Sequence, residues 1–198
     1  MAFTFFFRDK HTLDLLAQLL HELGDSAASL RIWDAGCAMG PEPYTFAIIL
    51  RERFGSAFGR IRIDATDIDE SGHFGEIIEA GIYEHGDVSR MPEDILDRYF
   101  LRQDDGRYLI DSEIRRAVSY GWHDLLTFQP YSRPYHIVLC KNVLLHFTAE
   151  QRVQAVRMFH DVLEPGGFFA TEQTQPMPPE CAHLFERIAS DANVYRRL

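Results

Sequence analysis

Residues 33–48 read WDAGCAMGPEPYTFAI, and this stretch decides the fold. LRIWDAG at 30–36 is an apolar run that predicts a buried strand. Pro41 and Pro43 predict the start of a helix that continues over 42–54. Between the two elements stand Gly36 and Gly40, four residues apart. A strand, a glycine turn and a helix in this order are typical of α/β proteins that bind a nucleotide.

Strand and helix patterns alternate along the rest of the chain. Apolar and β-branched runs predict further strands at 61–69, 117–125, 135–142, 168–173 and 193–198. Helical spacing predicts helices in the second half of 3–23, over 70–83, over 89–100 with Ser89 as N-cap, and from Thr148, which forms a capping-box pattern with Gln151. Two short runs around Asp105-Gly106 predict a β-hairpin inserted between the second and third main strands. The alternation predicts a mostly parallel, doubly wound α/β sheet with helices on both faces.

The composition excludes several classes of function. The chain has 198 residues, of which 46% are hydrophobic and 25% charged, as expected for one soluble cytoplasmic domain. The net charge of −10 argues against a nucleic-acid-binding surface, and no apolar run approaches the roughly 20 residues that span a bilayer. The three cysteines form no CxxC pair and the nine histidines show no metal-ligand spacing, so neither a disulfide framework nor a metal site is expected.

The glycine turn discriminates among nucleotides. No Gly-Lys-Ser/Thr follows it, so it is not a Walker A loop, and its GxxxG spacing is not the GxGxxG of dinucleotide-binding proteins. The acids that end the second strand, Asp67 and Asp69, stand about 30 residues beyond Gly36, whereas a nicotinamide site needs an acid at about 20.

S-adenosylmethionine fits this turn better. The cofactor has no phosphate and carries a positive amino group and sulfonium, so a carboxylate such as Glu42 attracts it, and an acid after the second strand can accept from both ribose hydroxyls. The alternative is a glycine turn that serves only the core, with a solvated Glu42.

Six motifs in one order carry a resemblance to a known family. They are TFFFR at 4–8, DAGCAMGPEPYTFAI at 34–48, ATDID at 65–69 followed by GIY and RYF, Asp124-Leu125 after a strand, CKNVLLHF at 140–147, and LEPGGF at 163–168. Over about 170 residues the chain resembles the catalytic part of the CheR-type chemoreceptor glutamate methyltransferases.

This resemblance implies a seven-stranded, Rossmann-like class I S-adenosylmethionine-dependent methyltransferase domain over residues 1–198, with an inserted β-subdomain at about 98–116. Thr4 and Arg8 would close over the methionine end of the cofactor, Glu42 would hold its amino group and Asp67 its ribose. Asp124 and Leu125 would contact the adenine, and Asn142 would lie under the sulfonium. The expected cofactor-binding residues are thus Thr4, Arg8, Gly36, Glu42, Asp67, Asp124, Leu125, Lys141 and Asn142, and the expected catalytic residues are Arg8 and His146.

The same residues also have plainer interpretations. Arg8 at the start of an exposed helix is otherwise a solvated charge. Asp67 and Asp69 would then cap the next helix, and Asn142 would satisfy a turn.

The implied reaction is the attack of a glutamate carboxylate on the methyl carbon of the sulfonium. A glutamate with a pKa near ~4.3 is already ionised at neutral pH, so no general base is required. Several positions depart from the family: Pro41 replaces a glutamate, Lys141 an arginine and His146 a tyrosine, while TEQTQ at 171–175 stands where the family has Gly-His-Ser-Glu. The 198 residues also hold no counterpart of the family's basic N-terminal helical domain, which affects the substrate more than the chemistry.

The resemblance therefore predicts a protein-glutamate O-methyltransferase of a chemoreceptor-like, acidic protein, docked in some members through the β-subdomain. Two alternatives stay open. One is a methyltransferase for another protein or a small carboxylic acid, and the other is a module that binds S-adenosylmethionine and a partner without turnover.

Overall fold

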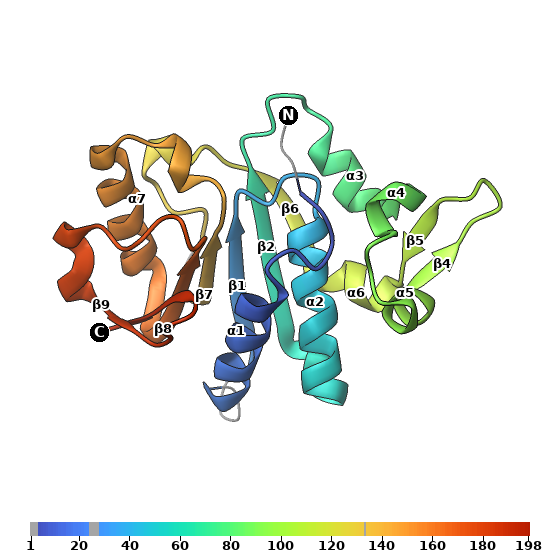
Figure 1. Ribbon diagram of the computed structural model, residues 1–198, viewed down its shortest axis with the longest axis horizontal. Coiled ribbons are helices and arrows are strands. Elements are labelled where there is room, and N and C mark those ends of the chain that lie inside the picture. The colour runs from blue at the N-terminus through green and yellow to red at the C-terminus, as the bar shows by residue number, and fades with distance from the viewer. Residues whose placement is uncertain (1–3, 24–27, 133) are drawn as a thin grey trace.

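The computed structural model describes residues 4–23, 28–132 and 134–198, and within them seven strands form the main sheet (Figure 1). Their order is β6-β2-β1-β7-β8-β10-β9, and β10 runs antiparallel to both neighbours while the other adjacent pairs are parallel. The mostly parallel seven-stranded α/β fold is confirmed. The strands are β1 (Leu30–Ala35), β2 (Ile61–Asp67), β6 (Val118–Trp122), β7 (Tyr135–Cys140), β8 (Leu163–Thr171), β9 (Phe185–Arg187) and β10 (Asn193–Arg197).

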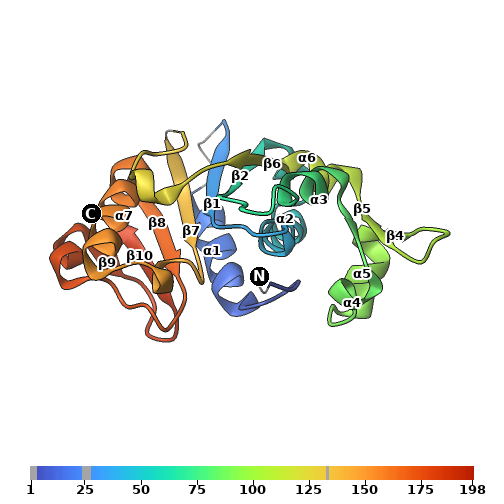
Figure 2. The same cartoon turned by 90° about the horizontal axis from the view of Figure 1, so that it is seen from above.

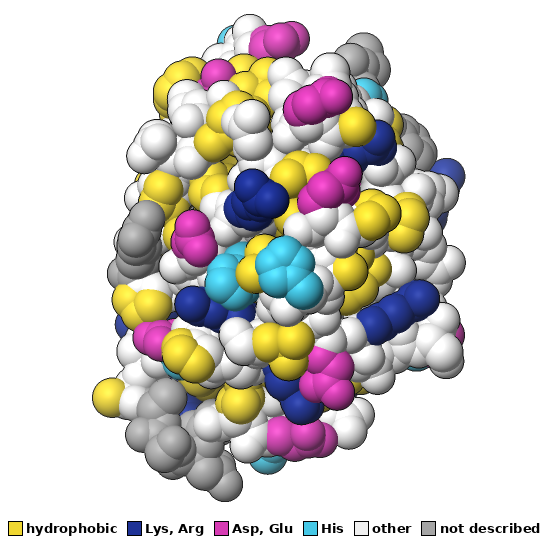
Figure 3. Space-filling view, turned by 90° about the vertical axis from the view of Figure 1, so that its left-hand side faces the viewer, with side chains coloured by type: hydrophobic (Ala, Val, Ile, Leu, Met, Phe, Trp, Pro, Cys, Tyr) yellow, Lys and Arg dark blue, Asp and Glu magenta, His cyan; other side chains and the backbone are white. Residues whose placement is uncertain are grey.

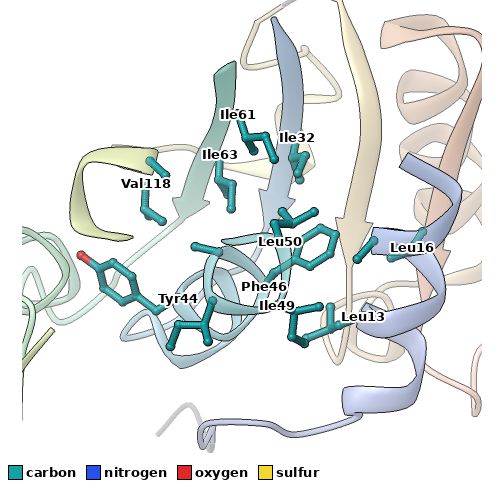
Figure 4. Close-up of a cluster of buried hydrophobic side chains, with 14 of the residues drawn as sticks. Leu13, Leu16, Ile32, Tyr44, Phe46, Ile49, Leu50, Ile61, Ile63 and Val118 are labelled. Carbon is teal, nitrogen blue, oxygen red and sulfur yellow. The ribbon is translucent and has the colours of Figure 1, made fainter. Parts of the chain in front are cut away.

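Helices cover the sheet on both faces (Figure 2). Alternate residues of a strand point to opposite faces, so Ile32 of β1 packs against α1 (Lys10–Leu23) and α2 (Pro41–Phe54), and Trp33 packs against α7 (Ala149–Val162). Figure 4 shows the buried cluster that Ile32 forms with side chains of α1 and α2. There Leu13 and Leu16 of α1 lie beside Ile49 of α2, and the side chains of α2 face those of the strands. The second half of the expected helix at 3–23 and the helix at 42–54 are thereby confirmed.

Trp33 of β1 packs on the face of the sheet that α7 covers, opposite to the face covered by α1 and α2. Its ring is fully buried, stacks on Tyr135 at 5.6 Å and meets Phe159 of α7 edge-on at 5.4 Å. Its Nε1 donates a hydrogen bond to Thr66 Oγ1 at 2.8 Å, so burial leaves no unpaired donor. Truncating a buried tryptophan of this kind costs roughly 3–5 kcal/mol, which makes this contact a main support of the α7 layer.

A smaller antiparallel sheet follows β2 and lies at the end of the molecule away from α7 (Figure 1). Its order is β3-β5-β4, with β3 (Ile82–Tyr83), β4 (Phe100–Arg102) and β5 (Tyr108–Ile110). The hairpin around Asp105-Gly106 is confirmed, and the left-handed φ of 86° at Gly106 explains its glycine. The boundaries of about 98–116 for a β-subdomain stay a prediction.

The remaining helices are short. They are α3 (Phe74–Ala80), α4 (His85–Val88), α5 (Glu93–Tyr99) and α6 (Ser112–Ala117), with 3₁₀ helices at Gly55–Arg60, Leu125–Thr127, Leu144–His146 and Pro179–Leu184.

Four details differ from the sequence predictions. Ser89 does not cap the helix of 89–100; it follows α4, and α5 begins only after Pro92, because proline holds the residue before it in extended geometry. Gly81, with a left-handed φ of 63°, ends α3, so Ile82 and Tyr83 form a strand instead of a last helical turn. Residues 112–117 form a helix that was not predicted, and β8 begins at Leu163 rather than at 168.

The face formed by α7 and the C-terminal strands mixes acidic, basic and apolar side chains, without a patch of one sign (Figure 3). In the described ranges, none of the helices combines the length and the apolar character that crossing a membrane requires.

The capping box of α7 gives a test of the fold. Thr148 Oγ1 accepts from Gln151 N at 3.3 Å, and Gln151 Oε1 accepts from Thr148 N at 2.8 Å. We expect Thr148→Ala to lower the free energy of unfolding by about 0.5–2 kcal/mol in urea titrations, and Thr148→Ser to stay within a few tenths of a kcal/mol of the parent. Equal losses in both variants would show that the hydroxyl does not act as a cap.

Candidate cofactor-binding site

A pocket of about 500 Å³ lies at the carboxyl ends of β1, β2, β6 and β7, where strand order reverses beside β1. Its size lies within the range of roughly 300–1,000 Å³ found for small-molecule sites. The structure brings all ten residues predicted from the sequence to this pocket: Thr4, Arg8, Gly36, Glu42, Asp67, Asp124, Leu125, Lys141, Asn142 and His146. Their roles in binding and catalysis stay predictions.

The backbone of the turn after β1 requires glycine at positions 36 and 40. Gly36 and Gly40 have φ of 100° and 97°, and a Cβ at Gly36 would lie 2.2 Å from Val143 Cγ2. A Cβ at Gly40 would lie 2.7 Å from Ile78 Cγ1. The turn therefore brings bare backbone close to the loop after β7, and this approach shapes one wall of the pocket.

The two acids after β2 have different places. Asp67 lines the pocket, and its Oδ2 accepts from Ala38 N at 2.9 Å, so the carboxylate also holds the glycine turn. Asp69 instead accepts from His73 N at 3.2 Å and from Phe74 N at 2.8 Å, just before α3. The capping interpretation therefore applies to Asp69 and not to Asp67.

Lys141 carries a charge in the floor of the pocket. Its Nζ lies 3.0 Å from Glu42 Oε2 and 3.2 Å from Asp9 Oδ2, and its side chain is 1% exposed. Burial works against the ammonium, but the two carboxylates outweigh it, and the pKa of Lys141 is raised. The ion pairs tie the N-terminal segment, α2 and the end of β7 together.

Asp34 stands two residues before Gly36 and is not among the residues that line the pocket. It is fully buried in β1, and neither carboxylate oxygen has a hydrogen-bond partner within the described ranges. Burial, reinforced by Glu42 and Asp67 and opposed by Lys141, holds the pKa of Asp34 well above its ordinary value. The sequence carried a signal for it, since an acid in the middle of an apolar strand is rarely buried without a reason.

Asn142 has a strained backbone, with φ of 61°. Its N–H donates to Glu172 Oε2 at 2.8 Å, and the hydroxyl of Thr171 donates to the same oxygen at 2.8 Å. Glu172, which is 5% exposed, therefore supports the loop from β8. It belongs to the TEQTQ stretch that departs from the family pattern, and sequence reasoning gave it no role.

Apolar walls complete the pocket. Ile68, Val143 and Leu125 come from the loops after β2, β7 and β6, and sequence reasoning missed the first two. His123 also lines the pocket; burial lowers its pKa, and its Nε2 is buried without a hydrogen-bond partner among the described residues. Ile68, Val143 and His123 could have been found from their positions in the sequence, because each stands next to a residue that the motifs had singled out. The other lining residues that sequence reasoning did not select are Cys37, Ala38, Leu126, Leu145 and Phe147.

The polar groups that line the pocket suit S-adenosylmethionine. Three carboxylates, Glu42, Asp67 and Asp124, line the pocket and can bind an ammonium group, a ribose diol and an adenine amino group, whereas a nucleoside phosphate would meet repulsion from them. The parts of the chain that the structure describes contain no cluster of three or more histidine, cysteine or acidic residues that could hold a metal ion.

The fold and the site together define the class of Rossmann-like, class I methyltransferases. Among solved structures, TrmN from Thermus thermophilus shares this fold with a TM-score of 0.53 at 15% sequence identity, over 93% of this chain and 49% of that one. The family described as CheR methyltransferase, SAM binding domain, matches residues 2–194. The chain belongs to this family, and S-adenosylmethionine is its cofactor.

Two relatives are similar over most of the chain. The chemotaxis protein methyltransferase of Listeria innocua is 34% identical over 164 residues, which cover 82% of this chain and 60% of that protein. The chemotaxis protein methyltransferase of Escherichia coli is 30% identical over 171 residues, 83% of this chain and 57% of that protein. The chain thus spans less than two thirds of the length of either relative.

The carboxylates of the pocket give a test of the site. Glu42→Gln and Asp67→Asn each remove a charge-assisted hydrogen bond, and we expect each to weaken S-adenosylmethionine and S-adenosylhomocysteine about ten- to a hundredfold in calorimetry. Glu52→Gln is the matched control, since Glu52 lies on the same helix but pairs with Arg98 and Tyr99. Unchanged affinity in both pocket variants would refute this site.

Asp34 gives a test that depends on pH. Because the folded state binds the Asp34 proton more tightly than the unfolded chain, the stability from that proton is complete below about pH 3.9 and is lost as the pH rises through the folded pKa. Asp34→Asn has no such proton. We expect the free energy of unfolding of Asp34→Asn, relative to that of the parent, to increase as the pH rises, by at most on the order of 1 kcal/mol per pH unit. Urea titrations at several pH values measure this difference. A difference that does not change with pH would contradict this.

Proposed function

We propose that this chain binds S-adenosylmethionine in the pocket and transfers its methyl group to a carboxylate, that of a glutamate side chain in a chemoreceptor-like protein. The observation that carries the proposal is that Glu42, Asp67 and Asp124 line one pocket together with Arg8. The two relatives are named chemotaxis protein methyltransferases, and these names support a protein of chemotaxis as the substrate.

Each part of the pocket has a role in this proposal. Glu42 binds the amino group of the cofactor on the side of its carboxylate that Lys141 does not occupy. Asp67 accepts from the ribose hydroxyls, and Asp124 and Leu125 contact the adenine. Asp124 Oδ1 already accepts from Leu126 N at 2.9 Å, which leaves Oδ2 for the adenine amino group. Ile68 and Val143 provide apolar walls for the ring.

The reaction needs alignment more than acid–base chemistry. When bound, S-adenosylmethionine supplies a methyl group activated by a sulfonium. A bond forms between an acceptor carboxylate oxygen and the methyl carbon, and the electron pair of the broken carbon–sulfur bond stays on sulfur. No proton moves, because the acceptor is already ionised. Arg8 orients the carboxylate, and the apolar walls exclude water, which favours a step that neutralises opposite charges.

A second substrate class is favoured by the mouth of the pocket. His146 is exposed there, in the place of a tyrosine in the family pattern, and it offers an imidazole to the acceptor. The net charge of −10 also opposes the approach of an acidic helical bundle. Another protein or a small carboxylic acid is therefore the second candidate acceptor, with the same chemistry.

The small sheet offers a place for a peptide to dock. β4 is an edge strand of the β-subdomain (about residues 98–116), and Leu101 on it is 65% exposed. An extended segment can add to such an edge through backbone hydrogen bonds. A docked tether would raise the local concentration of the acceptor and offset the repulsion between like charges.

Methyl transfer from labelled S-adenosylmethionine tests the proposal. These 198 residues should methylate an untethered receptor cytoplasmic fragment slowly, and the rate should rise with salt because screening weakens the repulsion. A fragment fused to the chain through a flexible linker should react faster and release methanol in base, as a methyl ester does. Glu42→Gln, measured at a limiting concentration of S-adenosylmethionine, is the control with reduced activity.

Two results would contradict this account. Fast methylation of the untethered fragment that does not depend on salt would refute the need for a tether. S-adenosylmethionine binding without ester formation on the fused fragment, on other acidic proteins or on small carboxylic acids would refute the enzyme and leave a binding module.

A further inference from the structure

Two guanidinium groups lie against the ring of Phe5, which stands between the pocket residues Thr4 and Arg8 in the sequence. Cζ of Arg90 is 5.1 Å from the centroid of the Phe5 ring, and Cζ of Arg8 is 5.9 Å from the same centroid. The two cationic carbons are therefore no more than about 11 Å apart. Thr4 and Arg8, on either side of Phe5 in the sequence, both line the pocket. Arg90 is thus one aromatic ring away from the cofactor site.

Packing fixes this arrangement from both sides. Phe6 is 1% exposed and meets Tyr83 and Phe100 edge-on at 4.9 and 5.4 Å, so the N-terminal segment is anchored to the small sheet. Arg90 stands between Val88 and Met91, which are both buried. The buried neighbours fix the backbone of the turn between α4 and α5, and from it the exposed Arg90 side chain reaches the ring of Phe5.

We propose that Arg90 is a specificity-determining residue, which together with Arg8 binds the carboxylates of the methyl acceptor at the mouth of the pocket. This inference rests on the proposed function. A guanidinium held over an aromatic face keeps its N–H groups at its edge, where they can bind a carboxylate in bidentate geometry. In a chain of net charge −10, two cations beside one opening select an anionic acceptor at close range.

Steady-state kinetics with the fused receptor fragment and with its untethered form test the role of Arg90. We expect Arg90→Ala to raise KM for the untethered fragment roughly three- to tenfold, with kcat of the fused fragment and the affinity for S-adenosylhomocysteine unchanged. Arg90→Lys should recover part of the loss, because it keeps the charge without the planar fork. Arg53→Ala is the matched control, since it removes the same charge from an exposed position on α2.

A second measurement does not depend on turnover. N-acetyl-L-glutamate N′-methylamide, titrated into the protein saturated with S-adenosylhomocysteine, should shift the arginine Nε–Hε NMR signal that disappears in Arg90→Lys. The signal of Arg53, assigned in the same way, should not move. A shift at Arg90 without methyl transfer by the parent protein would refute the proposed function and retain the carboxylate site.

Three results would overturn the inference. If Arg90→Ala weakens S-adenosylhomocysteine as much as the acceptor, Arg90 only holds Phe5 and the N-terminal segment. If Arg53→Ala raises KM equally, the effect is one of overall charge. If neither KM nor the NMR signal responds, Arg90 does not meet the acceptor.

Discussion

The ion pairs of Lys141 are the interaction on which the site depends. A buried ammonium without partners is costly, and removing one partner of a buried pair typically costs about 3–5 kcal/mol. Here one ammonium joins Glu42, on the helix that follows the glycine turn, to Asp9, in the segment that precedes the first helix. The N-terminal segment, α2 and the loop after β7, which are far apart in the sequence, thereby meet at one side of the pocket. These ion pairs act together with the packing of Phe6 on Tyr83 and Phe100 to hold the N-terminal segment, and with it Arg8, at the pocket.

Stability and function pull in different directions at this edge of the sheet. The non-glycine residues with left-handed φ in the described ranges are Phe7, Asp9, Ala38, Asp69, Phe128 and Asn142, and all lie in the N-terminal segment or in loops at the carboxyl ends of strands. Each such residue costs of order 1 kcal/mol or more and persists only where the surroundings enforce it. The two packed faces of the sheet, with Trp33 on one and Ile32 on the other, supply the rigidity that enforces them.

The layers of the fold could be predicted from periodicity because helices and strands bury faces with different repeats. The capping box at Thr148 and the Asp105-Gly106 hairpin could also be predicted, since a few side chains decide each of them locally. Ser89 failed as an N-cap because the restriction imposed by Pro92 overrides the preference of a serine three residues earlier.

Only part of the candidate site could be predicted from the sequence. Motif order brought out the polar residues of the pocket, but it could not show that Asp34 lacks a hydrogen-bond partner, because that depends on what packs around β1. Arg90 lies in a turn without a motif, and its place beside Phe5 arises from tertiary packing across 85 residues of sequence. A partner defined by a distant loop leaves no mark in the local pattern of a single sequence.

The acidic character of the chain acts at two ranges. A cationic cofactor is drawn to the carboxylates of the pocket, whereas an anionic acceptor is repelled by the body as a whole. At physiological ionic strength the Debye length is about 8 Å, so the repulsion from distant surface charges is largely screened near the opening. In the role proposed for them, Arg8 and Arg90, whose guanidinium groups lie against the same Phe5 ring, then decide the last step of approach. In the proposed function the same fold thus holds a positive ligand and admits a negative one, because the pocket carboxylates Glu42, Asp67 and Asp124 bind the first and Arg8 and Arg90 meet the second.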